Sequence, residues 1–330
     1  MEKKKFGYLI QIIFVVILIG IGLWSQRNRV YKSSQTAFIM DTFFEIEASG
    51  KLTDLDAVID SAFSLARDYE HLLSYYDEGS LISAVNNSQG EKTHIDRDLN
   101  NILAKGRYFY QATGGKYDLS IGGLSDLWDI TKARIPDEDE IAEALANTGF
   151  DRIVIEGDSI QVPSGMKLNL GSVAKGYIVD RVVDYLKSKG VSEILVNAGG
   201  DIRIWSSSET LIGIQHPRKE RGELIDKIRI KDQAVVTSGD YERYFEIEGV
   251  RYHHILDALT GYPARECVSV TAIANDAETA DALSTAAFVL PAQDAIKLAD
   301  GLSNGWVIIY HLEDGKLVKS VSSGTEEFLE

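Results

Sequence analysis

The stretch Leu168-Asn-Leu-Gly-Ser-Val-Ala-Lys-Gly176 joins a predicted strand to a predicted helix. Its apolar start is typical of a strand end, its Gly-Ser pair of a turn, and the run from Val173 to Lys189 of a helix that Gly190 ends. The free N–H groups of a helix N-terminus favour phosphate, and Lys175 adds a full positive charge in the first turn. The stretch matches neither the Walker A nor the GxGxxG pattern. It therefore predicts either an anion site or ordinary helix capping.

On both sides of this turn, helix-like and strand-like segments follow one another irregularly. Helical spacing recurs at 55–73, 98–113, 141–146 and after Asn275, where Glu278 is expected to complete a capping box. Residues 25–36 are expected to form a polar linker. Strands are expected at 38–48, 153–155, 159–162, 193–196, 201–205, 244–247, 252–255, 268–274 and 306–310. The regular alternation of a doubly wound sheet is missing, so we predict one α+β body with mixed or antiparallel sheets and packed helices.

Composition excludes several classes of protein. The chain has 330 residues, of which 25% are charged and 45% hydrophobic, which is typical of a globular protein. Its single cysteine, Cys267, excludes an intrachain disulfide and cysteine-based zinc or iron–sulfur sites. The six histidines show no HExxH spacing. A net charge of −16 argues against non-specific binding to nucleic acid, so no nucleic-acid partner is expected.

The N-terminus is basic and apolar, unlike the acidic body. Residues 8–24 carry no charge and are flanked by three lysines on one side and Arg27 on the other. Such a run reaches the lower limit for a membrane-spanning helix, with Tyr8 and Trp24 at its ends as interfacial aromatics. We predict an uncleaved, single-pass anchor and linker at 1–32 and an extracytoplasmic catalytic domain at 33–330. A cleaved signal peptide and a buried soluble helix are the alternatives.

Three more stretches are rich in residues that bind anions or metals. Gly114-Gly115, followed by Lys116, Tyr117 and Asp118, would let backbone approach a ligand or would merely end a helix. On the helix after Asn275, Asp281 and Thr285 share one face, and their oxygens suit Mg²⁺; Asp281 could equally offset the helix dipole.

The last of these stretches contains two adjacent histidines. Thr237-Ser-Gly-Asp-Tyr-Glu-Arg-Tyr244 precedes His253 and His254 on a predicted strand, where neighbouring side chains point to opposite faces. At most one of the two therefore serves a given site, as a general base toward a hydroxyl or as a structural group. Together, the stretches indicate Mg²⁺-assisted chemistry on a phosphate-bearing ligand.

In their order and spacing, these stretches resemble the ApbE family of FAD:protein FMN transferases. The likeness runs from about Met40 to Leu290 and includes further matches to family motifs. The matching segments are Met40-Asp-Thr42, Thr113-Gly-Gly-Lys-Tyr-Asp118, Leu170-Gly-Ser-Val-Ala-Lys-Gly-Tyr-Ile-Val-Asp180, Val196-Asn-Ala-Gly-Gly-Asp201, Thr237 to Tyr244, His253-His-Ile-Leu-Asp257, Thr260-Gly-Tyr-Pro263 and Ala280 to Thr285. The resemblance implies an ApbE-like fold related to the T-fold.

The resemblance also implies an activity and its residues. Members of the family move FMN from FAD to a Ser or Thr hydroxyl of a target flavoprotein, form a phosphoester, release AMP and need Mg²⁺. His254 is then the catalytic base, and Asp281, Thr285 and an oxygen of Ser172 are Mg²⁺ ligands, with Ser284 as a further candidate. The implied flavin contacts are Met40, Tyr76 (or its neighbour Tyr75), Tyr117, Asp118, Asn169, Lys175 and Ile255.

Two alternatives and several departures accompany this interpretation. The same groups could hydrolyse FAD to FMN and AMP, and a third possibility is flavin binding without turnover. The family usually has Asp where this chain has Asn169. Many of its members are lipoproteins, whereas this chain has no lipid-accepting cysteine after its apolar segment. The expected acceptor carries a Ser/Thr-Gly-Ala-Ser/Thr-like segment in a respiratory or extracellular electron-transfer subunit.

Overall fold

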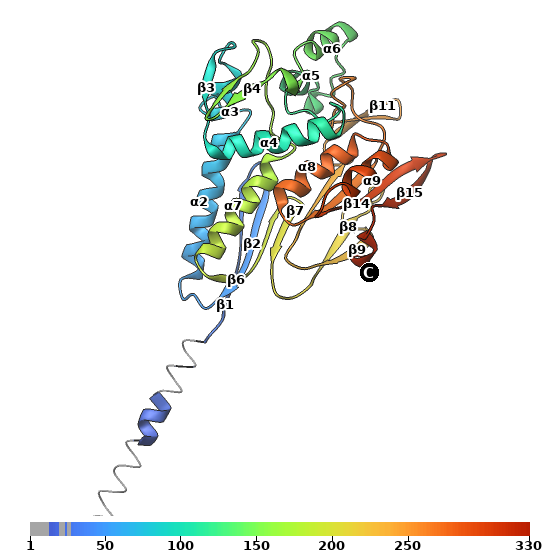
Figure 1. The fold of residues 1–330 in the computed structure, drawn as a ribbon. Helices are drawn as coiled ribbons and strands as arrows, with labels where there is room; N and C mark the ends of the chain where they lie inside the picture. The colour runs from blue at the N-terminus through green and yellow to red at the C-terminus, as the bar shows by residue number, and fades with distance from the viewer. Residues whose placement is uncertain (1–12, 20–23, 25–27) are drawn as a thin grey trace, which may run out of the picture.

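A single antiparallel sheet of eight strands organises the protein, and the computed structural model describes residues 13–19, 24 and 28–330 (Figure 1). The strand order is β1-β2-β6-β7-β10-β13-β14-β15. All seven neighbouring pairs are antiparallel, which confirms the predicted α+β class. The strands are Tyr31–Ile39 (β1), Thr42–Gly50 (β2), Val191–Ala198 (β6), Asp201–Trp205 (β7), Ala234–Gly239 (β10), Ser269–Ala274 (β13), Gly305–Glu313 (β14) and Lys316–Val321 (β15).

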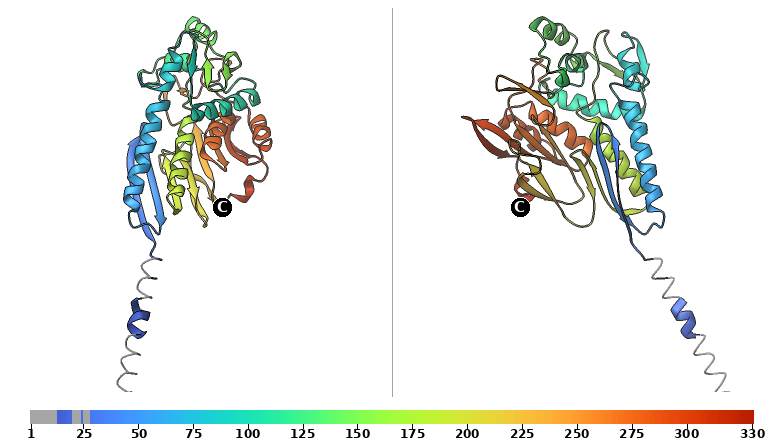
Figure 2. Two further views of the ribbon diagram at one scale, coloured as in Figure 1. Left: turned by 60° about the vertical axis from the view of Figure 1, so that its left-hand side comes forward. Right: turned by 180° about the vertical axis from the view of Figure 1, so that it is seen from behind.

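Four helices cover one face of this sheet, as the turned view and the view from behind show (Figure 2). They are Leu55–Leu73 (α2), Ala174–Ser188 (α7), Ala277–Phe288 (α8) and Ala292–Asp300 (α9). The main hydrophobic core lies between these helices and the sheet. The opposite face packs a smaller cluster against the ribbon of Thr210–Gln215 (β8) and Leu224–Ile230 (β9). Sheet burial on both faces explains why β13 is buried at every position.

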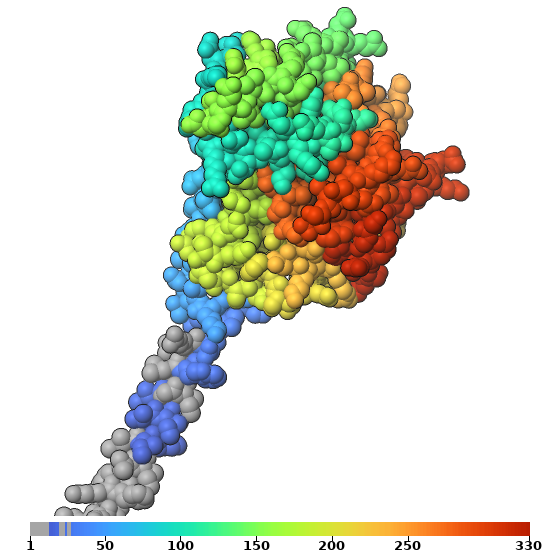
Figure 3. All heavy atoms as spheres, viewed as in Figure 1, coloured from blue at the N-terminus to red at the C-terminus, as the bar shows by residue number. Residues whose placement is uncertain are grey.

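An upper layer sits on α7 and α8 (Figure 3). Helix Arg97–Ala112 (α4) packs on α8 and carries this layer. Its other elements are Leu81–Asn86 (α3), Gly122–Leu127 (α5), Glu138–Leu145 (α6), the small sheet of Lys92–His94 (β3), Val154–Glu156 (β4) and Ser159–Gln161 (β5), and the one-turn helices Ile130–Lys132 and Phe150–Arg152. The hairpin of Tyr244–Ile247 (β11) and Val250–His253 (β12) lies beside this layer, and the short helix Thr325–Glu327 ends the chain.

Two local predictions were wrong. The segment 25–36 is not a linker throughout, because β1 begins at Tyr31 and pairs with β2 along its whole length. Its alternate side chains face solvent, so the polar residues of β1 hide the strand from a hydropathy reading. The predicted boundary after residue 32 therefore cuts into the folded domain. In α8 the N-cap is Asp276, which accepts from the Thr279 N–H, rather than Asn275.

The predicted membrane segment is described only in part. Residues 13–19 and 24 are described, whereas the rest of the run 8–24 lies outside the described residues. Among the helices that the structure does describe, none combines the length and the apolar character that crossing a bilayer requires.

Candidate active site

Helices α7 and α8 touch near their N-termini, and the contact leaves no room for a side chain at Gly176. A Cβ atom on Gly176 would stand 2.2 Å from the carbonyl oxygen of Ala277 and 2.8 Å from Cβ of Asp281. The Gly176 N–H donates to Asp281 Oδ2 at 2.9 Å. In return, Asp180 on α7 accepts from the N–H groups of Ala277 and Glu278. Each helix thus supplies a carboxylate to N-terminal donors of the other, which fixes their crossing.

Replacement of Gly176 by alanine is expected to destabilise the protein by roughly 1–3 kcal/mol, because the new methyl group meets backbone that cannot give way. The same displacement should move Asp281 and lower activity. Gly123→Ala is the matched control, since a Cβ there meets nothing within 4 Å. Thermal unfolding of both variants measures the difference. Equal melting temperatures for the two variants would show that α7 and α8 can separate freely.

Lys175 projects from the first turn of α7 to the turn between β6 and β7. Its Nζ lies 2.9 Å from Oδ1 of Asp201, whose side chain is only 3% exposed. Burial alone would lower the pKa of the Lys175 ammonium, but the Asp201 and Asp281 carboxylates outweigh it and raise the pKa. Lys175 therefore stays positively charged at neutral pH.

The acids around Lys175 form a setting suited to a divalent cation. Burial raises the pKa of both Asp201 and Asp281, and the charge of Asp201 raises that of Asp281 further. Oδ2 of Asp201 is buried and has no hydrogen-bond partner in the described part of the chain. One ammonium offsets two buried carboxylates, so an added cation would relieve an uncompensated charge. Across residues 13–19, 24 and 28–330, however, no three His, Cys, Asp or Glu side chains converge as a metal cluster.

Three hydroxyl groups lie near Asp281, those of Ser284 and Thr285 on α8 and that of Ser238 on β10. Ser238 was not among the predicted site residues. The Ser238 hydroxyl lies 2.8 Å from that of Ser284 and 3.2 Å from that of Thr285. The Ser284 hydroxyl also donates to the backbone oxygen of Asp281. Thr285 thus lies one helical turn beyond Asp281, as predicted, whereas Ser284 is already engaged within the helix. Any cation here would take one carboxylate and several hydroxyl or carbonyl oxygens, a donor set that suits Mg²⁺.

Tyr117 approaches the same place from the Gly114-Gly115 loop. Its side chain is buried, and the Ser172 hydroxyl donates to the Tyr117 oxygen at 3.0 Å. Burial raises the pKa of Tyr117, and the Asp281 charge raises it further. The structure therefore brings together Tyr117, Ser172 and the acidic group of Asp281.

The adjacent histidines occupy opposite faces of the hairpin, as strand alternation predicts. His253 is buried, its Nε2 lies 2.8 Å from the Ala264 oxygen, and its ring packs edge-on against Phe288. His254 is exposed to solvent at its surface, and neighbouring protein desolvates its ring in part. This desolvation, with smaller effects from His253, Arg243 and Lys175, lowers the pKa of His254 to about 4. Its imidazole is therefore neutral at pH 7.

Two of the predicted flavin contacts have structural roles in this protein. Asp118 accepts from four donors, the N–H and hydroxyl of Ser120 and the N–H groups of Gly149 and Phe150. Its carboxylate therefore shapes the loop beside Tyr117. The Asn169 amide oxygen accepts from the Gly171 N–H at 2.9 Å and so stabilises the turn before α7.

The remaining three predicted flavin contacts, Met40, Ile255 and Tyr76, lie in different parts of the structure. Met40 is at the turn between β1 and β2 with a positive φ of 55°, and its N–H donates to Glu70. Ile255 is buried directly after His254. Tyr76 is 81% exposed and meets Tyr75, whose hydroxyl donates to Gly122 and Asp126. In the described part of the chain, the Tyr75 hydroxyl is hydrogen-bonded and the Tyr76 hydroxyl is not. No contact joins the Tyr76 side chain to Lys175 or Asp281 there.

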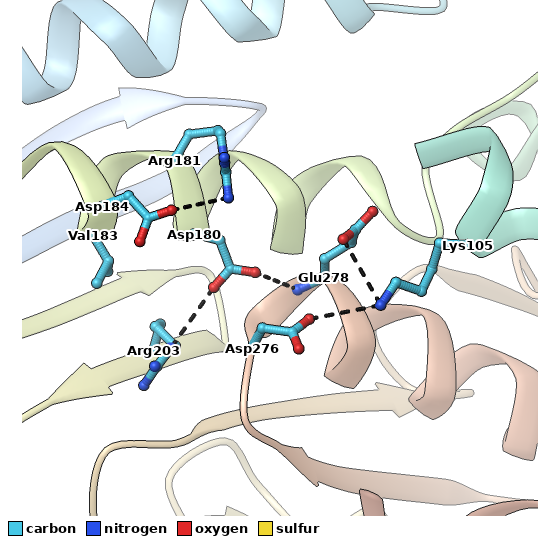
Figure 4. A pocket seen from close by; sticks show the side chains of 8 residues that line it. All are labelled: Lys105, Asp180, Arg181, Val183, Asp184, Arg203, Asp276 and Glu278. Carbon is cyan, nitrogen blue, oxygen red and sulfur yellow. Dashed lines mark hydrogen bonds and ion pairs between the residues drawn. The ribbon is translucent and has the colours of Figure 1, made fainter. Parts of the chain in front are cut away.

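A separate charged pocket of about 210 Å³ is lined by residues of α4, α7, β7 and the start of α8 (Figure 4). Lys105 of α4 reaches Asp276 and Glu278, and Arg203 of β7 faces Asp180. Burial raises the pKa of Glu278 to about 7. None of the predicted site residues lines this pocket. Its ion pairs hold α4, α7 and α8 together, and Lys175, Asp281 and His254 remain the candidate site.

The fold and site define a class of protein. The antiparallel α+β domain contains a helix N-terminus, a paired lysine, buried acids and a neutral histidine. These groups are typical of enzymes that act on phosphate-bearing ligands. The sequence matches the ApbE family over residues 40–309, and the chain belongs to this family. The resemblance drawn from the motifs is thereby confirmed.

Known relatives agree in sequence and in structure. The chain is 33% identical over 304 residues to the FAD:protein FMN transferase of Treponema pallidum, covering 84% of each chain. It is 35% identical over 271 residues to that of Klebsiella pneumoniae, covering 80% of this chain and 83% of the relative. The crystal structure of the ApbE protein of Thermotoga maritima superposes with a TM-score of 0.83 at 33% identity, covering 91% of this chain and 100% of the other. The flavin transferase ApbE of Vibrio cholerae gives a TM-score of 0.82 at 26% identity, with the same coverage.

Proposed function

We propose that this protein is an FAD:protein FMN transferase, which moves FMN from FAD to a Ser or Thr hydroxyl of a flavoprotein and releases AMP. The observation that carries the proposal is Lys175 in the first turn of α7, paired with Asp201 at 2.9 Å, in a domain that also presents a solvent-exposed His254. Relatives of similar length bear the name of this activity. A base and a bound cation are what attack of a hydroxyl on a phosphate ester requires.

The proton has a defined route. Nδ1 of His254 lies 3.4 Å from the Arg243 carbonyl oxygen, which can only accept, so the tautomer with Nδ1 protonated leaves Nε2 free. Nε2 takes the proton of the acceptor hydroxyl while that oxygen bonds to the FMN phosphorus. The bond from this phosphorus to the bridging oxygen of the pyrophosphate breaks, and AMP leaves with the electron pair.

The residues present fit Mg²⁺. Asp281 and Thr285 would hold it together with an oxygen of Ser172. The Ser284 hydroxyl already donates to the Asp281 backbone oxygen and lies 2.8 Å from the Ser238 hydroxyl, so it would offer the ion one lone pair at most. Bound there, the ion would neutralise charge on the pyrophosphate. Lys175 would bind the same group and be held in place by Asp201. Tyr117 and Ile255 would line the flavin site directly, Met40 and Tyr76 would close its rim, and Asp118 and Asn169 would shape the loops that carry it.

Hydrolysis of FAD to FMN and AMP is the second candidate function. The same base would then activate water, and the exposure of His254 allows water to reach it. A flavin-binding protein without turnover is the third. Product analysis separates the three, because only the transferase adds the mass of FMN to an acceptor, and only a non-catalytic protein leaves FAD intact.

We also propose that the segment before β1, with its uncharged run 8–24, anchors the protein as a single membrane pass, with the catalytic domain on the extracytoplasmic side. The support is the uncharged run 8–24 between basic flanks. The acceptor would be a membrane-associated or extracellular electron-transfer subunit with a Ser/Thr-Gly-Ala-Ser/Thr-like segment.

Deletion of residues 1–28 tests the anchor. The cut leaves β1 intact, since this strand begins at Tyr31. We expect the full chain to sediment with membranes and the shortened chain to be soluble, with unchanged AMP release from FAD. A full chain that stays in the soluble fraction would refute the anchor, and a soluble but inactive shortened chain would show that the segment belongs to the catalytic fold.

A further inference from the structure

Arg243 lies directly opposite His254 in the β11–β12 hairpin. Tyr244 pairs with His253, and the His254 N–H donates to the Arg243 oxygen at 3.2 Å, so the ladder continues by one more pair. Opposite residues of an antiparallel pair extend their side chains from the same face, with Cα atoms about 5.5 Å apart. The next pair on this face, Phe245 and Tyr252, stacks with ring centroids 5.2 Å apart, as this alternation requires.

The guanidinium of Arg243 has no ion pair or hydrogen bond within residues 13–19, 24 and 28–330. Other arginines around this hairpin are engaged. Arg218 and Arg251 both bind Asp240, and Arg265 donates to the Arg251 oxygen. Arg243 is also exposed, so its charge is available to a ligand.

The position of this charge is specific. Arg243 lies opposite His254 in the hairpin, and its charge lowers the pKa of both His254 and Lys175. The carboxylates of Asp201 and Asp240 already form ion pairs, Asp201 with Lys175 and Asp240 with Arg218 and Arg251. An unpaired guanidinium opposite His254 is available to the phosphate that the hydroxyl partner of His254 attacks.

We infer that Arg243 is a further catalytic residue, which binds the phosphoryl oxygens of the FMN phosphate during its transfer. The inference rests on the proposed function. As the FMN phosphorus passes from the AMP oxygen to the acceptor oxygen, the planar guanidinium would hold two of its oxygens and stabilise their charge. Its charge would also keep His254 neutral and ready to accept the hydroxyl proton.

The test compares Arg243→Gln and Arg243→Ala with Arg221→Gln in the full chain in detergent. Arg221 is an exposed arginine of the β8–β9 loop, so its variant makes the same change of charge away from the site. The reaction contains FAD, Mg²⁺ and a test protein bearing a Ser-Gly-Ala-Thr segment, and flavin fluorescence gives the FAD affinity of each variant. We expect Arg243→Gln to lower kcat about 100-fold or more, with a smaller change in FAD affinity, and Arg221→Gln to match the unaltered protein.

Added guanidinium ion supplies a second readout. It should restore part of the transfer rate of Arg243→Ala and none of that of His254→Ala, because only the first variant lacks a guanidinium. An active unaltered enzyme whose Arg243 variants keep full kcat, or lose only FAD affinity without rescue, would overturn the role of Arg243. An unaltered enzyme that neither transfers FMN nor releases AMP would instead overturn the proposed function, and this role with it.

Discussion

Replacement of Asp281 by asparagine is expected to lower Mg²⁺-dependent FMN transfer by at least about 100-fold while the fold survives, since charge stabilisation by a catalytic metal ion is worth several kcal/mol. The asparagine oxygen can still accept from the Gly176 N–H, which Asp281 now does at 2.9 Å. What it lacks is the negative charge that would hold Mg²⁺. The measurement is AMP release as a function of Mg²⁺ concentration, beside a thermal unfolding curve.

Asp281→Ala provides the comparison. It removes both the charge and the acceptor, and it leaves a buried N–H group of Gly176 unpaired at a cost of about 1–3 kcal/mol. The two variants should be equally inactive, but only the alanine variant should unfold at a lower temperature. Undiminished activity of the asparagine variant would remove Asp281 from the metal site.

Replacement of His254 by alanine is expected to slow FMN transfer about 100- to 10,000-fold, the usual contribution of a general base. FAD binding should change far less, because Lys175 and the α7 N-terminus would hold the pyrophosphate. His253→Ala is the informative neighbour. His253 is buried against Phe288, so its loss should lower stability more than it lowers the turnover of the folded fraction.

The pH dependence follows from the same geometry. Desolvation lowers the pKa of His254 to about 4, and His253, Arg243 and Lys175 add to the effect, while the hydrogen bond to the Arg243 oxygen opposes it. A base works only when unprotonated, so kcat/KM should stay level from pH 8 to about 5 on account of His254 and fall as the pH drops through about 4.

A variant of His254 that loses FAD affinity in proportion to its rate would show that the histidine only binds substrate.

The parts of the site that could be predicted from sequence are local in the chain. The Gly-Ser turn before α7, the i,i+4 placement of Asp281 and Thr285, and the opposite faces of His253 and His254 all follow from backbone periodicity. Helix α2 was also predictable, because its apolar spacing is long and regular.

The remainder depends on which elements meet in space. Asp201 was predicted only as the first residue of a strand after a Gly-Gly turn, and nothing local indicates that it pairs with Lys175 of α7. Gly176 becomes essential only when α8 lies against it. Asp118 has the residue type of a ligand contact, but its loop turns it inward to four donors. Strand β1 is hidden because its alternate polar side chains face solvent.

The most direct test of the whole account is the mass of an acceptor protein after incubation with this chain, FAD and Mg²⁺, recorded together with the AMP released. We expect an acceptor heavier by one FMN, one AMP for each FMN attached, and neither product when Mg²⁺ is removed or when the acceptor Ser or Thr is replaced by alanine. AMP release from FAD with no mass gain on any Ser/Thr-bearing acceptor would contradict the transferase and establish a hydrolase, and intact FAD bound without either product would contradict both.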